Sequence, residues 1–308
     1  MSCAYKVVLR PSGVKGACAR SDLSLPPGES ILGASIIDPV TDPAERIGKV
    51  HPQTVDVVGL GQCCLDYIST IAEYPEVDKK CEVTGLTIQG GGPVATALVA
   101  LARWNLRYAI MGITGDDPFA EEIRTSLQQE QIDIAGLQIR RQSASQVAFI
   151  VVERGSGQRN IFWQRPQGPA LAVGEIDIDL ITRARVLHTD GLFAEAALEA
   201  SRAARRSGVP VVVDAGTLRP GMLPLAGSSD YFIASESFGR QLIGRDAPQQ
   251  ACREIHKLGP RLACVTLGAR GYVASWAGRT IEKQPTPSRQ WTLPAAVISF
   301  MPLLSMDC

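Results

Sequence analysis

The stretch Val186–Asp214, VLHTDGLFAEAALEASRAARRSGVPVVVD, carries the pattern that decides the fold. Its first residues form a short apolar strand, and Ala194–Ser207 predicts a helix that Gly208 stops. Pro210–Asp214 then has the continuous apolar run of a strand buried on both faces. Strands that alternate with helices of this length are typical of a mostly parallel α/β sheet.

The same alternation extends over the chain from Val55 onward. We expect further strands at Val55–Leu60, Tyr108–Gly112, Tyr231–Ala234 and Ala263–Leu267. We expect further helices at Pro93–Trp104 and Pro248–Leu258, and one more that begins at the cap Asp116-Asp117-Pro118. Lys79–Gln89 and Gln146–Trp163 instead alternate like antiparallel strands. They predict a small second sheet, a lid, with strands at about 68–90 and 143–165. The fold class is therefore α/β, with one domain over residues 55–284.

The composition excludes several classes of protein. The 308 residues include 31 basic and 31 acidic side chains, which is not the balance of a nucleic-acid-binding protein. No apolar run is long enough for a membrane span, and the first residues lack the apolar core of a secretory signal. The eight cysteines contain no C-x-x-C pair, which argues against a zinc site and fits buried apolar thiols. We expect a cytoplasmic protein.

Residues 1–54 differ from the rest of the chain. They are rich in Pro, Gly and Ser and show no sustained hydrophobic period. Such a composition is typical of a poorly ordered extension. The sequence therefore predicts that the α/β domain begins at Val55.

Glycines mark two candidate ligand loops. Gly90–Pro93 opens an alanine-rich helix, where bare backbone amides can approach a ligand closely. Gly59-Leu60-Gly61 follows a strand, as in dinucleotide-binding proteins, but Cys64 occupies the place of the third glycine. An NAD-dependent oxidoreductase is therefore the less favoured interpretation. Asp66, in the turn after the first strand, could accept hydrogen bonds from a polyol or simply form the turn.

Taken together, five motifs in order resemble the ribokinase-like, PfkB-type carbohydrate kinases. They are Gly59–Asp66, Gly90–Trp104, Thr114–Asp117, Val211–Pro220 (VVVDAGTLRP) and Val265–Val273 (VTLGARGYV). The resemblance spans about three quarters of the chain, from Val55 to Lys283. It implies a three-layer α/β/α fold with a β-sheet lid, and it implies a homodimer through that lid.

The resemblance also implies roles for particular residues. Sugar-binding positions are Asp66, Gly91, Gly92, Thr96 and Asp190, and positions on the nucleotide side are Ser235, Glu236, Thr266, Gly268 and Gly271. The expected co-substrate is ATP with Mg²⁺. The family's Asn-x-x-Glu reads Ser235–Phe238 here, so the glutamate that helps to order magnesium is missing and the metal ligands stay open.

Two of the aspartates have alternative interpretations. Asp190 could equally begin the helix near Ala194. Asp214 ends a strand at the edge where open α/β sheets hold ligands, yet it could merely shape the turn.

The chain departs from the family after Pro285. The Gly-x-Gly-Asp turn that supplies the family's catalytic aspartate is absent, so no catalytic residue is assigned. Read one base out of frame, Trp291–Ile298 can encode Asp-Thr-Thr-Gly-Cys-Gly and then Asp, which resembles the missing motif. We interpret residues 285–308 as a frameshifted tail. The predicted function is ATP-dependent phosphorylation of a small sugar or polyol, impaired in this chain; the alternative is a non-catalytic sugar- or nucleotide-binding remnant.

Overall fold

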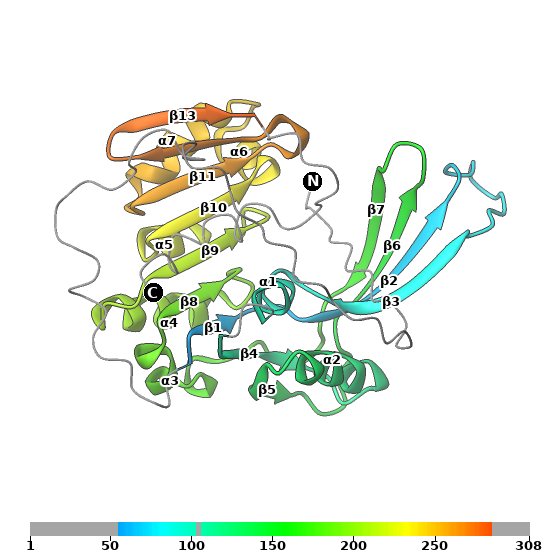
Figure 1. Cartoon of the computed structure of the whole chain (residues 1–308), viewed down its shortest axis with the longest axis horizontal. Helices are drawn as coiled ribbons and strands as arrows, with labels where there is room; N and C mark the ends of the chain where they lie inside the picture. The colour runs from blue at the N-terminus through cyan, green and yellow to red at the C-terminus, as the bar shows by residue number, and fades with distance from the viewer. Residues whose placement is uncertain (1–54, 103–105, 285–308) are drawn as a thin grey trace, which may run out of the picture.

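The computed structural model describes residues 55–102 and 106–284. The expectations for residues 1–54 and 285–308 therefore concern positions outside the described part of the chain. The described residues form one large sheet flanked by helices and one small sheet that stands away from it (Figure 1).

The large sheet has nine strands in the order β13-β12-β11-β10-β9-β8-β1-β4-β5. The seven strands from β11 to β5 are parallel, whereas β12 and β13 are antiparallel additions at one edge. The strand bounds are β1 (Val57–Leu60), β4 (Tyr108–Thr114), β5 (Asp133–Ile139), β8 (Val186–Thr189), β9 (Val211–Ala215), β10 (Tyr231–Ser235), β11 (Leu262–Thr266), β12 (Tyr272–Trp276) and β13 (Arg279–Lys283).

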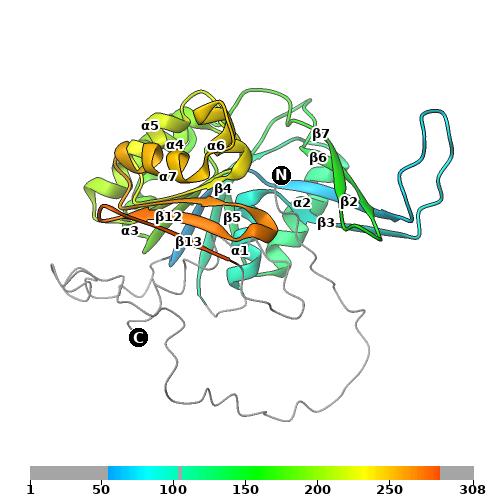
Figure 2. The ribbon, with the colours of Figure 1, turned by 90° about the horizontal axis from the view of Figure 1, so that it is seen from above.

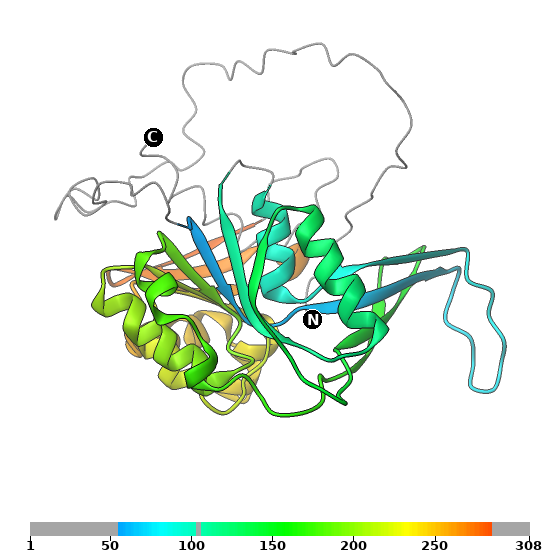
Figure 3. The ribbon, with the colours of Figure 1, turned by 90° about the horizontal axis from the view of Figure 1, so that it is seen from below.

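Helices cover both faces of this sheet. One face packs against α3 (Ile178–Arg183), α4 (Ala194–Arg206), α5 (Met222–Gly227), α6 (Glu236–Ile243) and α7 (Pro248–Lys257) (Figure 2). Figure 3 shows the other face, where α1 (Pro93–Ala102) and α2 (Pro118–Gln129) lie against β1, β4 and β5. The α/β class predicted from the alternating pattern is therefore confirmed.

The side chains of the central strands are buried on both faces of the large sheet, which explains their continuous apolar runs. In β9, Val211 and Val213 enter the hydrophobic cluster beneath α4, while Val212 enters the cluster on the opposite face. Successive side chains of a strand point to opposite faces, so a strand buried on both sides must be apolar throughout. Among the described residues, no helix is both long and apolar enough to cross a membrane.

The small sheet, which we call the lid, has the order β3-β2-β6-β7. Its strands are β2 (Cys64–Ile71), β3 (Gly85–Gly91), β6 (Val147–Glu153) and β7 (Arg159–Gln164). The existence of a second, smaller sheet is confirmed. The strand predicted from Lys79 begins only at Gly85, because the preceding charged residues are exposed and lie outside the β2–β3 ladder.

Candidate functional site

The candidate ligand residues gather at the carboxyl ends of the parallel strands. Asp190 follows β8, and Asp214, Ser235 and Thr266 lie in the last two positions of β9, β10 and β11. In open α/β sheets this edge holds ligands, because the loops that leave the strands there surround a common crevice. The lid joins the same edge, since β2 follows β1 after only three residues.

Asp66 lies on β2, and residues of β2 and β3 set the position of its carboxylate. The Cys64 thiol donates to Asp66 Oδ1 at 3.0 Å, and burial raises the pKa of the half-buried Asp66 carboxyl. Gly91 is the ladder partner of Cys64 on the neighbouring β3, and a Cβ there would come within 2.2 Å of Asp66 Oδ2. Glycine at position 91 therefore makes room for this carboxylate.

The next glycine shapes the entry into α1. Gly92 has φ +97°, a conformation that favours glycine, and a Cβ there would lie 2.5 Å from the Gln62 carbonyl oxygen. That carbonyl accepts from the Ala95 amide at 3.3 Å, while the Thr96 amide donates to Gly92 O at 2.9 Å. Thr96 is half-buried on this first turn. The glycine loop thus wraps tightly around Gln62.

Asp190 holds the same loop from the other side. Its Oδ2 accepts from the Gln62 amide at 2.9 Å, and its Oδ1 accepts from the Leu192 amide at 2.9 Å. Burial raises the pKa of this carboxyl, against the lowering effect of those two amides. Asp190 does not cap α4, whose first helical residue is preceded by Phe193. Through Gln62, the structure brings Asp66, Gly91, Gly92, Thr96 and Asp190 to one place.

Asp214 adds a second carboxyl next to Asp190. It is half-buried near the end of β9, and burial together with the charge of Asp190 raises its pKa to about 7. Two carboxyl groups that share a poorly solvated place disfavour each other's ionised form. The Asp214 carboxyl of this pair therefore changes its protonation state near neutral pH.

The residues predicted for the nucleotide side lie two strands away. Ser235 and Thr266 are register partners in β10 and β11, and Thr266 Oγ1 donates to Ala234 O at 3.3 Å. Ser235 Oγ accepts from the Phe238 amide at 3.0 Å and donates to Gly216 O at 2.7 Å, so it caps α6. This cap is a structural role that Ser235 already performs.

Glu236, the first residue of α6, is neutralised by two arginines. Its Oε1 pairs with Arg240 on the next turn and with Arg270 at 2.7 Å. Arg270 belongs to the turn η3 (Gly268–Arg270), so this ion pair ties the turn after β11 to α6. A carboxylate engaged in this way is poorly available to a metal ion.

The turn after β11 depends on two glycines with positive φ. Gly271, at φ +88°, donates to Gly268 O at 3.0 Å and accepts from Leu267 at 2.8 Å. A Cβ at Gly271 would fall 1.9 Å from Lys283 O, so only glycine fits there. Gly268 has φ +60° and open space where a side chain would be, which leaves its backbone accessible.

Metal-binding groups do not cluster in residues 55–102 and 106–284. No three His, Cys, Asp or Glu side chains there come close enough to hold an ion. The described thiols include buried Cys63 and Cys64, and burial raises the pKa of Cys63 to about 12.

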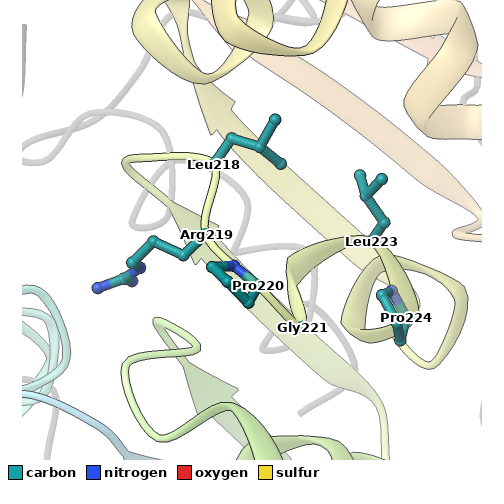
Figure 4. Close-up of a pocket in the computed structure, with 6 residues that line it drawn as sticks. All are labelled: Leu218, Arg219, Pro220, Gly221, Leu223 and Pro224. Atoms are coloured by element: carbon teal, nitrogen blue, oxygen red, sulfur yellow. The ribbon is translucent and has the colours of Figure 1, made fainter.

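Sequence reasoning missed two residues of this edge: Gln62 and Arg219. Gln62 acts through its backbone, which leaves no residue-type signal. Arg219 is the arginine of VVVDAGTLRP, which was quoted as a motif without a role. Figure 4 shows the Arg219 side chain pointing away from Leu218 and Leu223, its neighbours in a pocket wall.

The fold and the site together define a class of protein. It is an α/β protein with two groups of candidate ligand residues on one edge of the large sheet and with the lid joined to the same edge. Residues 55–292 match the family model described as pfkB family carbohydrate kinase. The chain is a member of this family. Its members, which include fructokinases and ribokinases, are phosphotransferases with an alcohol group as acceptor.

Individual relatives agree with this assignment. Fructokinase-2 of Solanum habrochaites is 26% identical over 164 residues, which are 53% of this chain and 48% of that protein. The structure of Arabidopsis thaliana ribokinase complexed with ribose and ATP is similar with a TM-score of 0.64 and 19% identity, covering 77% of this chain and 80% of that one. The structure of Halothermothrix orenii fructokinase is similar with a TM-score of 0.61 and 24% identity, covering 76% of this chain and 86% of that one. The chain spans about half the length of the curated relatives it matches.

Proposed function

We propose that this chain binds a small sugar or polyol between the lid and the large sheet, and that its lineage transfers a phosphoryl group from ATP to a hydroxyl of that sugar. The observation that carries the proposal is the half-buried Asp66 carboxylate, given room by Gly91 beside the loop that Asp190 holds. Carboxylates accept hydrogen bonds from neighbouring hydroxyls, and a fixed carboxylate orients a polyol.

Calorimetric titration with neutral sugars and polyols tests the sugar site. Asp66→Asn keeps the shape of the side chain but removes its charge, and we expect it to weaken sugar binding about 10-fold or more. Asp179→Asn removes an exposed carboxylate on α3 and serves as the matched control. Equal sugar affinity of wild type and Asp66→Asn would contradict the proposed site.

In this proposal ATP binds along the ends of β10 and β11. Gly268 offers an unobstructed backbone, and Thr266 and Gly271 shape the turn beside it. Ser235 and Glu236 hold that region together through the α6 cap and the pair with Arg270. Mg²⁺ would enter as MgATP, held mainly by phosphate oxygens, and would screen the charge that develops during transfer. Titration of MgATP into wild type and Gly268→Val tests this placement.

We also propose that these 308 residues transfer phosphoryl groups slowly or not at all. The family's catalytic aspartate is expected in a Gly-x-Gly-Asp turn, and residues 285–308, outside the described part, read differently. Loss of a general base alone costs about 10²–10⁴-fold in rate. An ADP-release assay measures this directly. Sequencing the codons for Pro285–Cys308 tests the frameshift: an intact frame with no family motif in the neighbouring frame would refute it.

Two alternatives are separated by the same assays. Sugar or nucleotide binding without turnover would favour a non-catalytic binding remnant. An oxidoreductase would bind NAD, but β2 follows the Gly59–Gly61 turn where the dinucleotide fingerprint needs a helix. Failure to bind NAD, with sugar or ATP binding present, would dispose of that alternative.

We further propose a homodimer through the lid. One lid face carries a row of apolar side chains across all four strands, with Tyr67 stacked on Phe149 at 5.3 Å between ring centroids. The other members of the row, Ile88 and Phe162, are exposed, as is most of Phe149. Such a patch on a free surface favours association. Light scattering should give a dimer for wild type and for the exposed control Val173→Ser, and a monomer for Phe149→Ser/Phe162→Ser.

A further inference from the structure

Gln146 places a buried amide at the base of the lid. It immediately precedes β6, and its backbone carbonyl extends the β2–β6 ladder by accepting from the Leu65 amide at 3.1 Å. The residue is 6% exposed, and its side-chain Oε1 is buried without a hydrogen-bond partner among the described residues. A buried amide oxygen without a donor is costly. This oxygen therefore points to a donor that a bound ligand supplies.

The Gln146 side chain lies on the lid face that carries Asp66. In the parallel β2–β6 ladder, Asp66 is the partner of Ala148. Ladder partners point to the same face, and side chains alternate along a strand. Gln146, two positions before Ala148, therefore shares the face of Asp66.

The residues next to Gln146 and Asp66 in the chain point to the opposite face, which packs against α2. Ser145 Oγ donates to Asp117 Oδ1, at the start of α2, at 2.6 Å. The ring of Tyr67 meets that of Phe119 on α2 edge to face, with 6.3 Å between centroids. Because both neighbours face α2, the amide and the carboxylate face the proposed sugar site together.

Cys64 links the amide to the carboxylate along this face. Extended by one residue, the β2–β6 register sets Gln146 beside Cys64, whose thiol donates to Asp66 Oδ1 at 3.0 Å. Neighbouring strands lie about 4.8 Å apart and two residues span about 6.6 Å along a strand, so the Cα atoms of Gln146 and Asp66 are about 8 Å apart. One small ligand can contact two long side chains at that separation.

We propose that Gln146 determines substrate specificity: its amide oxygen accepts from one hydroxyl of the sugar while Asp66 accepts from a neighbouring hydroxyl. The substrate class is then a sugar or polyol with two free hydroxyls on adjacent carbons. A deoxy sugar that lacks the hydroxyl facing Gln146 leaves the buried oxygen unpaired, and sites of this kind strongly reject such analogues. This inference rests on the proposed sugar site.

Calorimetry with deoxy sugars tests the assignment. The probes are whichever of D-ribose, D-fructose and D-glucose binds most tightly, and the analogues of that sugar with each hydroxyl removed in turn. Removal of one particular hydroxyl should cost wild type about 10-fold or more in affinity and should cost Gln146→Met less than about threefold. Gln146→Met itself should bind the parent sugar about 10-fold more weakly than wild type does.

Two further measurements separate recognition from a structural role. Gln128→Met replaces an exposed glutamine on α2 and should change no sugar affinity. Gln146→Met removes an oxygen that has no partner among the described residues, so its urea midpoint should equal or exceed that of wild type.

Three results would overturn the proposal. If removing each hydroxyl costs wild type and Gln146→Met the same affinity, the amide recognises none of them, and an effect of Asp66→Asn leaves the proposed sugar site standing. If Gln146→Met weakens the parent sugar and every analogue alike and lowers the urea midpoint, its role is structural. Failure of every sugar to bind wild type would reject the proposed sugar site as well.

Discussion

At the scale of single residues, the tightest fit in the site joins Gly91 to Asp66. The carboxylate occupies the space that any side chain at position 91 would take. Cys64 donates to one oxygen of this carboxylate, and burial raises the pKa of the Asp66 carboxyl. The orientation of the Asp66 carboxylate is therefore set by the space that Gly91 leaves without a side chain and by the hydrogen bond from Cys64.

Gly91→Ala should displace the Asp66 carboxylate. We expect sugar affinity to fall about 10-fold or more, with a stability loss of about 1–3 kcal/mol from overpacking. Calorimetry measures the first effect and urea denaturation the second. Gly85→Ala is the matched control, because it lies at the other end of β3 with no atom near its Cβ position. Unchanged sugar affinity in Gly91→Ala would contradict this account.

The pKa of Asp214 makes stability depend on pH. Burial and Asp190 raise its pKa from the usual 3.8 to about 7, so the folded chain keeps a proton that the unfolded chain releases. Its contribution is fully present below about pH 4 and is lost as pH rises through about 7. Asp214→Asn removes this loss. Its stability relative to wild type should rise by about 1–3 kcal/mol between pH 5 and pH 8.

Chemical denaturation at the two pH values measures that difference. Asp66 and Asp190 have raised pKa values as well, and burial lowers the pKa of His188 to about 4, which acts in the opposite direction. Comparing the variant with wild type cancels the contributions of Asp66 and His188, which stay in both proteins, so the difference reports on the Asp214–Asp190 pair. A difference that does not change with pH would contradict the prediction.

At the scale of elements, the β12–β13 hairpin closes the sheet beside the turn after β11. Its two-residue loop is Ala277-Gly278, with φ values of +46° and +73°. Positive φ at both positions is the mark of a type I′ turn, which favours Asn-Gly. Alanine in the left-handed region costs about 1 kcal/mol, so this loop carries local strain.

Ala277→Asn should relieve that strain. Asparagine tolerates positive φ better than alanine, and we expect the free energy of unfolding to rise by about 0.5–1 kcal/mol. The urea midpoint measures it, with sugar and MgATP binding unchanged as the control. A lower midpoint would show that the loop does not have the turn geometry described.

At the scale of the whole molecule, the lid is connected to the large sheet where β2 leaves β1, where β3 enters α1, and where β6 and β7 rejoin the chain at the sheet edge, and α2 packs against β2 and β3. A ligand held by Asp66 on the lid and Asp190 on the sheet would couple the two parts. Lids that close over a substrate exclude water, which limits wasteful hydrolysis in phosphoryl transfer.

Hydrogen–deuterium exchange measures this coupling. A bound sugar should slow exchange in β2, β3, β6 and β7 more than in β9 and β10, because the buried strands of the large sheet are already protected. The Asp66→Asn variant at the same sugar concentration is the control. Equal protection of both sheets, or none in the lid, would contradict a ligand bridging them.

Sequence reasoning found what local patterns encode. The helix over 194–207 and its stop at Gly208 could be recognised within a short window, and so could the Asp117 cap of α2 and the apolar strand before Asp214. Short-range periodicity and turn chemistry act between residues a few positions apart. It did not find β5, α3, α5, α6, β12 and β13, whose local signals are weaker.

The amino-acid sequence by itself determined the α/β class, the two glycine loops and the order of the family motifs. Only the tertiary structure decided the pairing of β2 with β6, the contact of Asp190 with Gln62 across 128 positions, and the hydrogen bond from Arg219 to the Asp190 carbonyl. The physical reason is range. Helix periods and caps depend on neighbours in the chain, whereas strand pairing, burial and charge convergence depend on groups that only folding brings together.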